Sequence, residues 1–351
     1  LAVDTTQATD TNRVKLYVNG EQVTFSASSY PTLDRDLYIN VSGSNHYIGT
    51  EQSGRYFDGY MSDVYLIDGQ QLAATDFGET DSVSGNWKAK AYTGGSYGAN
   101  GFFLQFQNSG ALGTDSSGNT NTFTVNNLTS VDQSTDTPTT VYATMNPLDN
   151  FYASSTFSNG NNTIVTNSGN YTYNSSTLAF SSGKYYCEAK LVSASAEDII
   201  GISSKLATSS TVIMGSNVYS QGYRSGGNSY TNNVQSSYGS SYTTGDIIGL
   251  AIDADNQKLY FSKNGVFQNS GVPTSGATGT GALSFPTDND GVYYVTMYDI
   301  SGSGSCTLST NFGSPPYASN GYSDGNGFGD FSYAVPTGYY ALNTQNLNAQ
   351  G

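Results

Sequence analysis

Tyrosine is the residue type in this chain that is best suited to contact a ligand. The chain has 351 residues, 29 of them tyrosine, and several lie in residues 217–242 (NVYSQGYRSGGNSYTNNVQSSYGSSY) between Gly, Ser and Asn. A tyrosine ring can stack on the C–H face of a sugar, while Ser, Gly and Asn supply adaptable hydrogen bonds. The segment predicts a binding loop, although the same residues could be ordinary hairpin residues of a tyrosine-rich sandwich. The candidate ligand-binding residues are Tyr219, Tyr223, Arg224, Tyr230, Tyr238 and Tyr242.

Two acidic turns contain oxygen ligands of the kind that Ca²⁺ prefers. Asp and Asn are also common in turns because they tolerate left-handed backbone and form Asx turns. Neither stretch has the spacing of an EF-hand. We therefore expect turn residues and no cofactor, with Ca²⁺ as the alternative. The candidate ligands are Asp253, Asp255 and Asn256 in the first turn, and Asp288, Asn289 and Asp290 in the second.

The carboxylates and the histidine do not show a catalytic pattern. Retaining glycosidases place two carboxylates about 5 Å apart, for example as Glu-x-Asp-x-x-Glu, whereas Glu188 and Glu197 each stand alone. His46 is the only histidine, and its surroundings, SGSNHYIGT, contain no nucleophile motif. We therefore predict that the chain is not an enzyme, and a glycan depolymerase remains the alternative.

The two cysteines, Cys187 and Cys306, are too few for a disulfide scaffold. No His/Cys cluster accompanies them, so a zinc site is not expected. They fall on the first and the penultimate predicted strands of the second half, which can be neighbours in a sandwich. A cross-strand disulfide is one interpretation. Two buried free thiols are the other, which we favour because free cysteine packs as a small hydrophobic residue.

The composition predicts the elements that must position these residues. Charged residues make up 11% of the chain and the net charge is −15. This charge repels phosphate backbones, so nucleic-acid binding is not expected, and no apolar run is long enough for membrane insertion. Aromatic residues make up 13% of the chain, which argues against disorder. Because Tyr, Thr, Val and Phe favour strands, the chain is predicted to be all-β.

Alternating apolar residues and turn signals predict antiparallel strands along the whole chain. The strongest signal lies at 13–25 (RVKLYVNGEQVTF), where Asn19-Gly20 forms a two-residue turn between two strands. Helix is not expected, apart from one short turn near 70–77. Short strands separated by frequent turns are typical of β-sandwiches. The other strands are predicted at 35–41, 46–50, 57–67, 101–107, 185–192, 198–203, 211–214, 217–223, 246–253, 257–262, 292–299 and 305–311.

The length and the distribution of these strands predict two tandem antiparallel β-sandwiches. Residues 1–110 form the first, and residues 151–347 form the second. Residues 111–150 are rich in Ser, Thr and Asn and are predicted to form a polar connector docked on the sandwiches.

Four motifs of the second half resemble the SPRY domain, in the order in which that family has them. They imply a SPRY-like sandwich over roughly 151–345, with a binding surface made by loops at one end. Cys187 stands where the family usually has Trp, which alters core packing rather than the fold. The motifs are YYCEAKL at 185–191, DIIGIS at 198–203, GDIIGLAIDADNQKLYFSKNG at 245–265 and NFGSPP at 311–316.

Residues 11–78 resemble the later part of a concanavalin A-like or laminin G-like domain. The segments that carry this resemblance are KLYVNGEQV, HYIGT and FDGYMSDVYLIDGQQL. The resemblance implies that the first sandwich is a jelly roll that is incomplete at its N-terminus.

Residues 115–150 and 336–347 (PTGYYALNTQNL) resemble tandem lectin-like and SPRY-like proteins of tailed bacteriophages, especially marine ones. The resemblance implies a tail-fibre or virion-appendage protein on the virion surface. Its expected partners are further copies of itself, other virion proteins, and a host surface glycan or receptor. A purely structural module that packs on other virion proteins is the alternative, since SPRY domains bind proteins more often than sugars.

Overall fold

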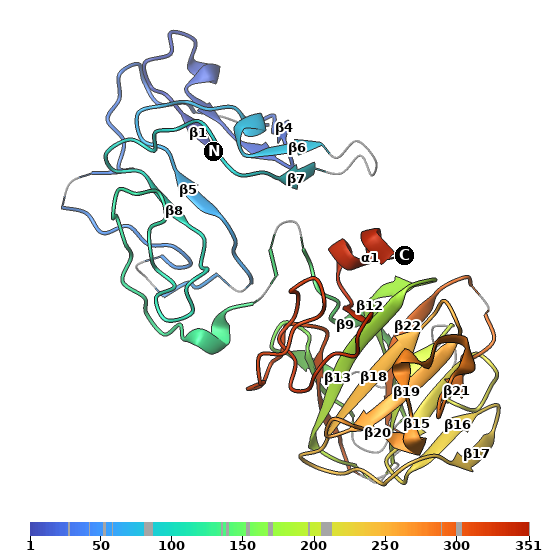
Figure 1. The fold of residues 1–351 in the computed structure, drawn as a ribbon. Helices are drawn as coiled ribbons and strands as arrows, with labels where there is room; N and C mark the ends of the chain where they lie inside the picture. Colours follow the sequence, from blue (N-terminus) through green and yellow to red (C-terminus); the bar gives the residue numbers. More distant parts are fainter. Residues whose placement is uncertain are drawn as a thin grey trace. The chain divides into compact units, whose positions relative to one another are not determined.

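The computed structural model describes most of the chain, and the described residues form two compact units (Figure 1). Leu1–Gln133 and Thr137–Thr139 make the first unit, and Ser134–Asp136 and Thr140–Gly351 make the second. This division differs from the predicted boundaries, because most of the expected connector belongs to the first unit and the second unit begins before residue 151. The residues outside the description are 27, 28, 42, 52, 53, 58, 81–86, 135, 138, 139, 152–154, 168–170, 196, 205–212, 289, 300–303 and 351.

The first unit consists of four two-stranded antiparallel pairs within its described residues. The hairpin predicted around Asn19-Gly20 is confirmed, since both turn residues have positive φ (50° and 83°). The predicted turn near 70–77 is the 3₁₀ helix η2 (Ala74–Asp76), which η1 (Asp10–Asn12) precedes and η3 (Ser130–Asp132) follows. The pairs are β1 (Ala2–Val3) with β2 (Val14–Lys15), β3 (Tyr17–Val18) with β4 (Glu21–Gln22), β5 (Val64–Leu66) with β8 (Phe102–Leu104), and β6 (Gly78–Thr80) with β7 (Trp87–Ala89).

A first sandwich is not confirmed by this arrangement. The strands predicted at 35–41 and 46–50 are absent from the described residues of those segments, where only an isolated bridge joins Thr50 to Tyr56. The physical reason is the small buried core, since stacked sheets need apolar faces to bury against each other. The hydrophobic residues that the described part of the unit buries are Phe102, Leu104 and Leu112.

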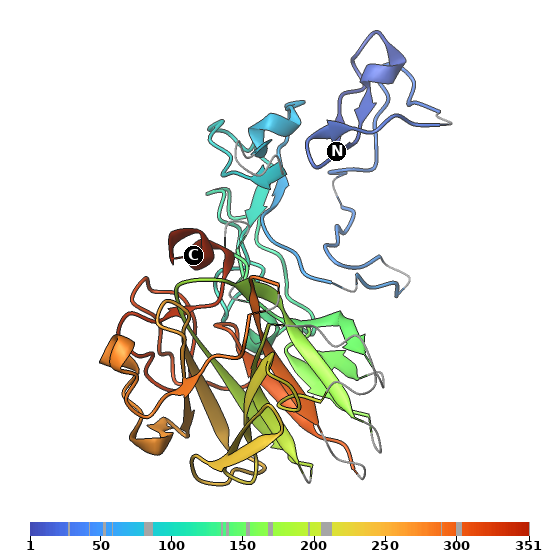
Figure 2. The same cartoon turned by 90° about the vertical axis from the view of Figure 1, so that its right-hand side faces the viewer.

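The second unit contains two antiparallel sheets that confirm the all-β prediction (Figure 2). The larger sheet has the order β10-β11-β23-β13-β18-β19-β20, with β21 beside β19 and β24 parallel to β13. The other sheet has the order β17-β16-β15-β14-β22-β12-β9. The larger sheet comprises β10 (Thr156–Ser158), β11 (Thr163–Val165), β13 (Lys184–Ser193), β18 (Ile247–Asp253), β19 (Lys258–Lys263), β20 (Val266–Phe267), β21 (Leu283–Ser284), β23 (Thr307–Asn311) and β24 (Tyr340–Ala341). The other comprises β9 (Met145–Phe151), β12 (Thr172–Phe180), β14 (Asp198–Ser203), β15 (Ser220–Arg224), β16 (Asn228–Thr231), β17 (Val234–Ser237) and β22 (Tyr293–Asp299).

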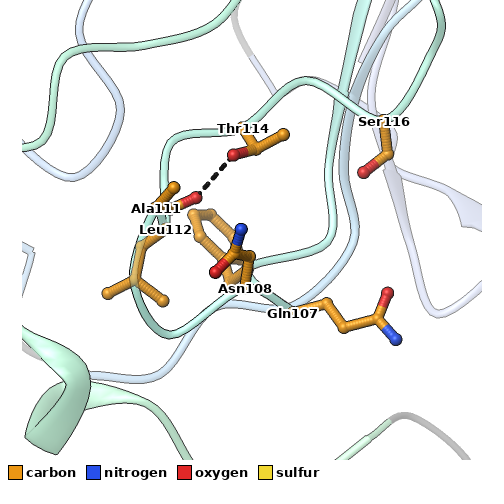
Figure 3. A pocket seen from close by; sticks show the side chains of 7 residues that line it. Gln107, Asn108, Ala111, Leu112, Thr114 and Ser116 are labelled. Atoms are coloured by element: carbon orange, nitrogen blue, oxygen red, sulfur yellow. Dashed lines mark hydrogen bonds between the residues drawn. The ribbon is translucent and has the colours of Figure 1, made fainter.

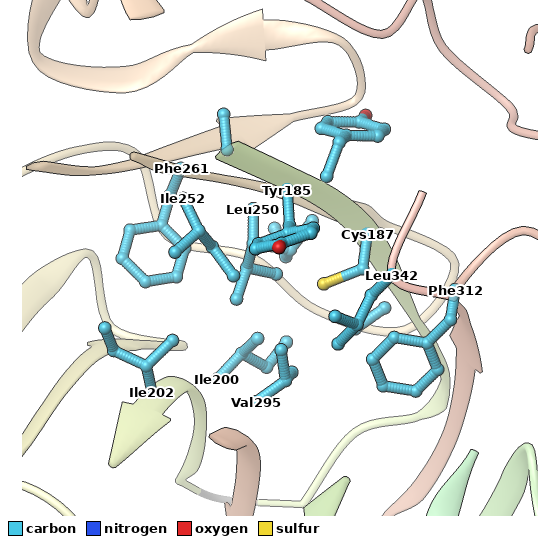
Figure 4. Packing of buried hydrophobic residues seen from close by; sticks show 14 of the residues in the cluster. Tyr185, Cys187, Ile200, Ile202, Leu250, Ile252, Phe261, Val295, Phe312 and Leu342 are labelled. Carbon is cyan, nitrogen blue, oxygen red and sulfur yellow. The ribbon is translucent and has the colours of Figure 1, made fainter. Parts of the chain in front are cut away.

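The core lies between these two sheets (Figure 4). Alternate residues of each strand face inward, as the two-residue period of a strand requires. Cys187 and Leu250 point from the larger sheet toward Ile200 and Val295 of the other. Burying each large apolar side chain stabilises the fold by about 1.5–3 kcal/mol. The interleaved inner faces therefore supply the main stability of the second unit.

The chain after β23 folds back over the outer face of β13, and we call residues 312–343 the C-terminal strap. Phe331 of the strap packs edge-on against Tyr186 of β13, with ring centroids 5.2 Å apart. The side chain of Asp324 organises the strap. It accepts hydrogen bonds from the backbone N–H groups of Phe328 and Ala341, and from the side chain of Asn346 in helix α1 (Thr344–Gln350). Two 3₁₀ helices, η4 (Gln268–Ser270) and η5 (Pro273–Thr278), follow β20. Within the described residues, no helix has the length and apolar character needed to cross a bilayer.

Candidate functional site

The tyrosine-rich segment is mainly part of the core. Tyr223, Tyr238 and Tyr242 are at most 5% exposed, and their rings pack against one another, with Tyr223 and Tyr238 also against Phe261. The hydroxyl group of Tyr242 donates to the backbone carbonyl of Tyr223 (2.7 Å), and that of Tyr223 donates to Ser240. Burial raises the pKa of Tyr238 to about 12. The prediction that these three rings contact a sugar is therefore wrong: they face the core, where their area stabilises the fold.

The other three candidates lie nearer the surface, but they are partly used by internal contacts. Arg224 is 9% exposed, forms an ion pair with Glu197 and lies over the ring of Tyr230, 5.3 Å from its centroid. The hydroxyl group of Tyr230 donates to Asn233 (3.2 Å). Tyr219 is half-buried. The candidates thus do not form one open surface, although Tyr219 and Tyr230 are only partly buried.

The carboxylates of the acidic turns stabilise local structure. Asp253 is fully buried, pairs with Lys184 (2.9 Å) and accepts hydrogen bonds from Asn256. Asp255 accepts from the backbone N–H of Gly183 (2.7 Å), and Asp288 accepts from that of Gly291 (2.7 Å). No group of three or more metal-binding side chains occurs within the described residues, which include Asp290 but not Asn289. In the structure Asp253 thus ends strand β18 and pairs with Lys184, while Asp255 and Asp288 stabilise loops through backbone N–H groups.

Both cysteines are free and buried in the structure, the arrangement that the favoured interpretation describes. β13 and β23 are neighbours, as predicted, but Thr307, the residue after Cys306, pairs with Ser193. Cys187 lies six residues earlier on β13, which is roughly 20 Å along a strand, whereas a disulfide needs Cα atoms within about 7 Å. Burial raises the pKa of both thiols.

Two carboxylates do come together in the second unit, but they are sealed from solvent. Asp198 and Asp299 are cross-strand partners with no exposed area, and the hydroxyl of Ser195 lies 2.7 Å from one and 2.8 Å from the other. Burial raises the pKa of Asp198, and the negative charge of Asp299 adds to this shift. The pair cannot contact a substrate. His46, in the first unit, accepts from the backbone N–H of Asn40 (2.9 Å) instead of activating a nucleophile.

Another buried carboxylate, Glu188 on β13, anchors the C-terminal strap. Its side-chain oxygens accept hydrogen bonds from the backbone N–H groups of Ser332 and Tyr333 (both 2.9 Å). They also accept from Asn311 and from the hydroxyl of Tyr186 (both 3.2 Å). Burial raises the pKa of Glu188, and the four donors oppose that shift. A residue that stood alone in the sequence thus positions the strap.

The strap and the outer face of the larger sheet together form a groove of about 490 Å³ with a mixed polar and apolar lining. This volume is within the range of about 300–1,000 Å³ typical of small-molecule sites. Its floor crosses β11, β23 and β13 at Thr163, Ser309 and Lys190, which lie in register. Sequence reasoning missed this groove, because Tyr317 of the strap is distant in the chain. The lining residues are Asn159, Thr163, Lys190, Leu191, Val192, Thr244, Gly245, Ser309, Pro316 and Tyr317.

A second, smaller pocket lies in the first unit (Figure 3). Its volume is about 180 Å³, below the usual range for ligand sites. The hydroxyl group of Thr114 donates to the carbonyl of Ala111 (2.7 Å), so this polar group is already used inside the pocket. The groove of the second unit is therefore the better candidate site.

Comparison with known proteins supports part of the expected organisation. The model of the SPRY domain family matches residues 184–287, which confirms the predicted resemblance for that stretch of the second unit. Among solved structures, 216 chains match. One is the crystal structure of the SPRY domain of human HERC1, which has 20% sequence identity and a TM-score of 0.38, with 47% of this chain and 96% of that chain covered. No curated protein matches the chain.

Proposed function

We propose that this chain is a non-enzymatic adhesion protein of a bacteriophage virion, part of a tail fibre or capsid appendage. We further propose that its second unit engages a host surface glycan. The observation that carries the glycan proposal is the open groove across β11, β23 and β13, whose lining combines hydroxyl groups with apolar surface. The SPRY match is compatible with a binding or structural role without catalysis. The virion assignment rests on the resemblance of residues 115–150 and 336–347 to phage proteins.

The groove offers the groups that a sugar needs. Hydroxyl groups both donate and accept hydrogen bonds. Thr244 supplies one in the lining, beside the buried hydroxyl groups of Thr163 and Ser309, which bond to each other in the floor. Tyr317 and Pro316 supply apolar surface beside them. A single shallow site of this kind binds weakly. Function would therefore depend on several copies, since linked sites raise apparent affinity by about 10²–10⁴, and we expect a homo-oligomer.

A second role, packing against other virion proteins, is favoured for the first unit by its exposed aromatic side chains. Tyr38 is 88% exposed, Tyr56 77% and Tyr60 65%. Exposed apolar surface of this kind marks a protein interaction site when it is contiguous. In this proposal the first unit attaches the protein to the particle surface, while the second unit recognises the host.

The test combines a glycan array with measurement of the oligomeric state. The full chain is expected to be a homo-oligomer at micromolar concentration and to bind a subset of bacterial surface glycans without releasing reducing ends. A monomer that binds no glycan would refute the adhesion proposal. Release of reducing ends from host polysaccharide would support the depolymerase alternative. Immunogold electron microscopy of phage particles would locate the protein on the virion.

A further inference from the structure

Lys190 gives the groove a positive charge that nothing in its lining neutralises. The lining contains no Asp or Glu. Two other lysines of the second unit, Lys184 and Lys263, are paired with Asp253 (2.9 Å) and Asp246 (3.1 Å). The described contact of the Lys190 ammonium group is instead the face of the Tyr317 ring, 5.1 Å from its centroid. A cation–π contact does not neutralise the ammonium charge, so Lys190 can still pair with an anionic group of a ligand.

The position of this charge is fixed from both sides. Lys190 is two residues after Glu188, so both side chains leave the outer face of β13. Glu188 holds the strap at Ser332 and Tyr333, and the same strap carries Tyr317 into the groove wall. The floor beside Lys190 is equally ordered, because the hydroxyl groups of Thr163 and Ser309 bond to each other (2.9 Å). The site is thus largely formed before a ligand arrives.

The same geometry favours a sugar over a peptide. Peptides that add to a sheet need a free strand edge, but β23 and β13 are paired on both sides along the floor of the groove. Of the lining residues besides Lys190 and Tyr317, Asn159, Thr163, Thr244 and Ser309 carry hydroxyl or amide groups, and the rest are apolar or glycine. Asn159 donates to Thr163 (3.1 Å), and the hydroxyl of Thr244 accepts from the backbone N–H of Ala194 (2.9 Å), which leaves its own proton for a ligand.

We propose that the groove recognises a carboxylated sugar of the hexuronate class, with the carboxylate at Lys190 and the ring hydroxyls over Thr163, Ser309 and Thr244. This inference rests on the proposed glycan-binding function and specifies its substrate class. In a chain of net charge −15, acidic polysaccharides are repelled by most of the surface. An uncompensated lysine in the groove therefore sets both the place and the orientation of binding.

The test uses the full chain on an array of neutral and hexuronate-containing oligosaccharides, including oligomannuronate and the same oligomer with its carboxyl groups reduced to alcohols. Wild-type protein is expected to bind hexuronate glycans and to lose about tenfold or more in affinity for the reduced oligomer. Lys190→Gln is expected to show the same loss for hexuronates, because it removes one charge-assisted hydrogen bond. Lys190→Arg is expected to restore binding. Lys258→Gln changes a half-buried lysine outside the groove and is the matched control.

The outcomes separate this inference from the function on which it rests. Binding of neutral glycans alone, or hexuronate binding that Lys190→Gln leaves unchanged, would overturn the hexuronate assignment while the adhesion proposal stands. Absence of binding to every glycan on the array would overturn both. Unchanged thermal unfolding of each variant, followed by near-UV circular dichroism, would show that a loss of binding is not a loss of fold.

Discussion

Replacement of Glu188 by Gln tests whether one buried carboxylate holds the C-terminal strap in place. In the wild-type protein each side-chain oxygen accepts two hydrogen bonds, one of them from a strap backbone N–H. Gln keeps the shape but turns one oxygen into an NH₂ group, so two buried donors lose their acceptor. Each donor left without an acceptor costs about 1–3 kcal/mol of stability. Part of this cost is offset because the neutral Gln side chain does not carry the desolvation penalty of a buried charge. We expect Glu188→Gln to lower the free energy of unfolding by about 2–4 kcal/mol.

Urea denaturation measures the change in stability, and amide hydrogen exchange at Ser332 and Tyr333 reports the strap directly. Both amides are expected to exchange faster in the variant. Glu197→Gln is the matched control, because the Glu197 side chain is 48% exposed and its ion pair with Arg224 is worth about 0.2–1 kcal/mol. A Glu188→Gln variant within about 0.5 kcal/mol of wild type, with unchanged exchange at both amides, would refute the anchoring role.

Three further predictions concern buried groups of the second unit. The stability of Asp299→Asn relative to wild type should rise by about 1 kcal/mol from pH 4 to pH 8, because the charge of Asp299 contributes to the raised pKa of Asp198, and a raised pKa means that wild-type stability is greatest below pH 3.8 and falls as pH rises. The gain should shrink toward pH 4 in urea denaturation, and a gain that grows there would contradict the sign. Tyr185→Phe removes a fully buried hydroxyl group that has no hydrogen-bond partner among the residues that the structure describes. The melting temperature of this variant should equal or exceed that of wild type, and a clear decrease would show that the hydroxyl group is satisfied. Cys187 and Cys306 should resist a thiol reagent in the folded protein, and both should react after denaturation without reductant; fewer than two reactive thiols would indicate oxidation.

Much of the second unit could be predicted because its signals are local. The strands predicted at 198–203 and 246–253 correspond to β14 (Asp198–Ser203) and β18 (Ile247–Asp253), where apolar runs lie between turns. The match to the SPRY family lies in the same part of the chain. In the first unit, strand-like patterns at 35–41 and 46–50 did not produce strands in the described residues. A strand needs a paired neighbour and a core face, and pattern alone supplies neither.

The candidate site, too, could be predicted only in part from the sequence. Tyrosine content and two-residue alternation establish from sequence alone that rings and small polar groups fill and cover paired sheets. Which rings face inward depends on the packing partner: Tyr223 is buried because Phe261 and the other sheet cover it. The groove exists only because the strap brings Tyr317 to Lys190, 127 positions earlier in the chain. The local sequence thus determined the strands and the alternation of their side chains. Which side chains remain available to a ligand was decided by contacts between distant segments, and these contacts exist only in the folded chain.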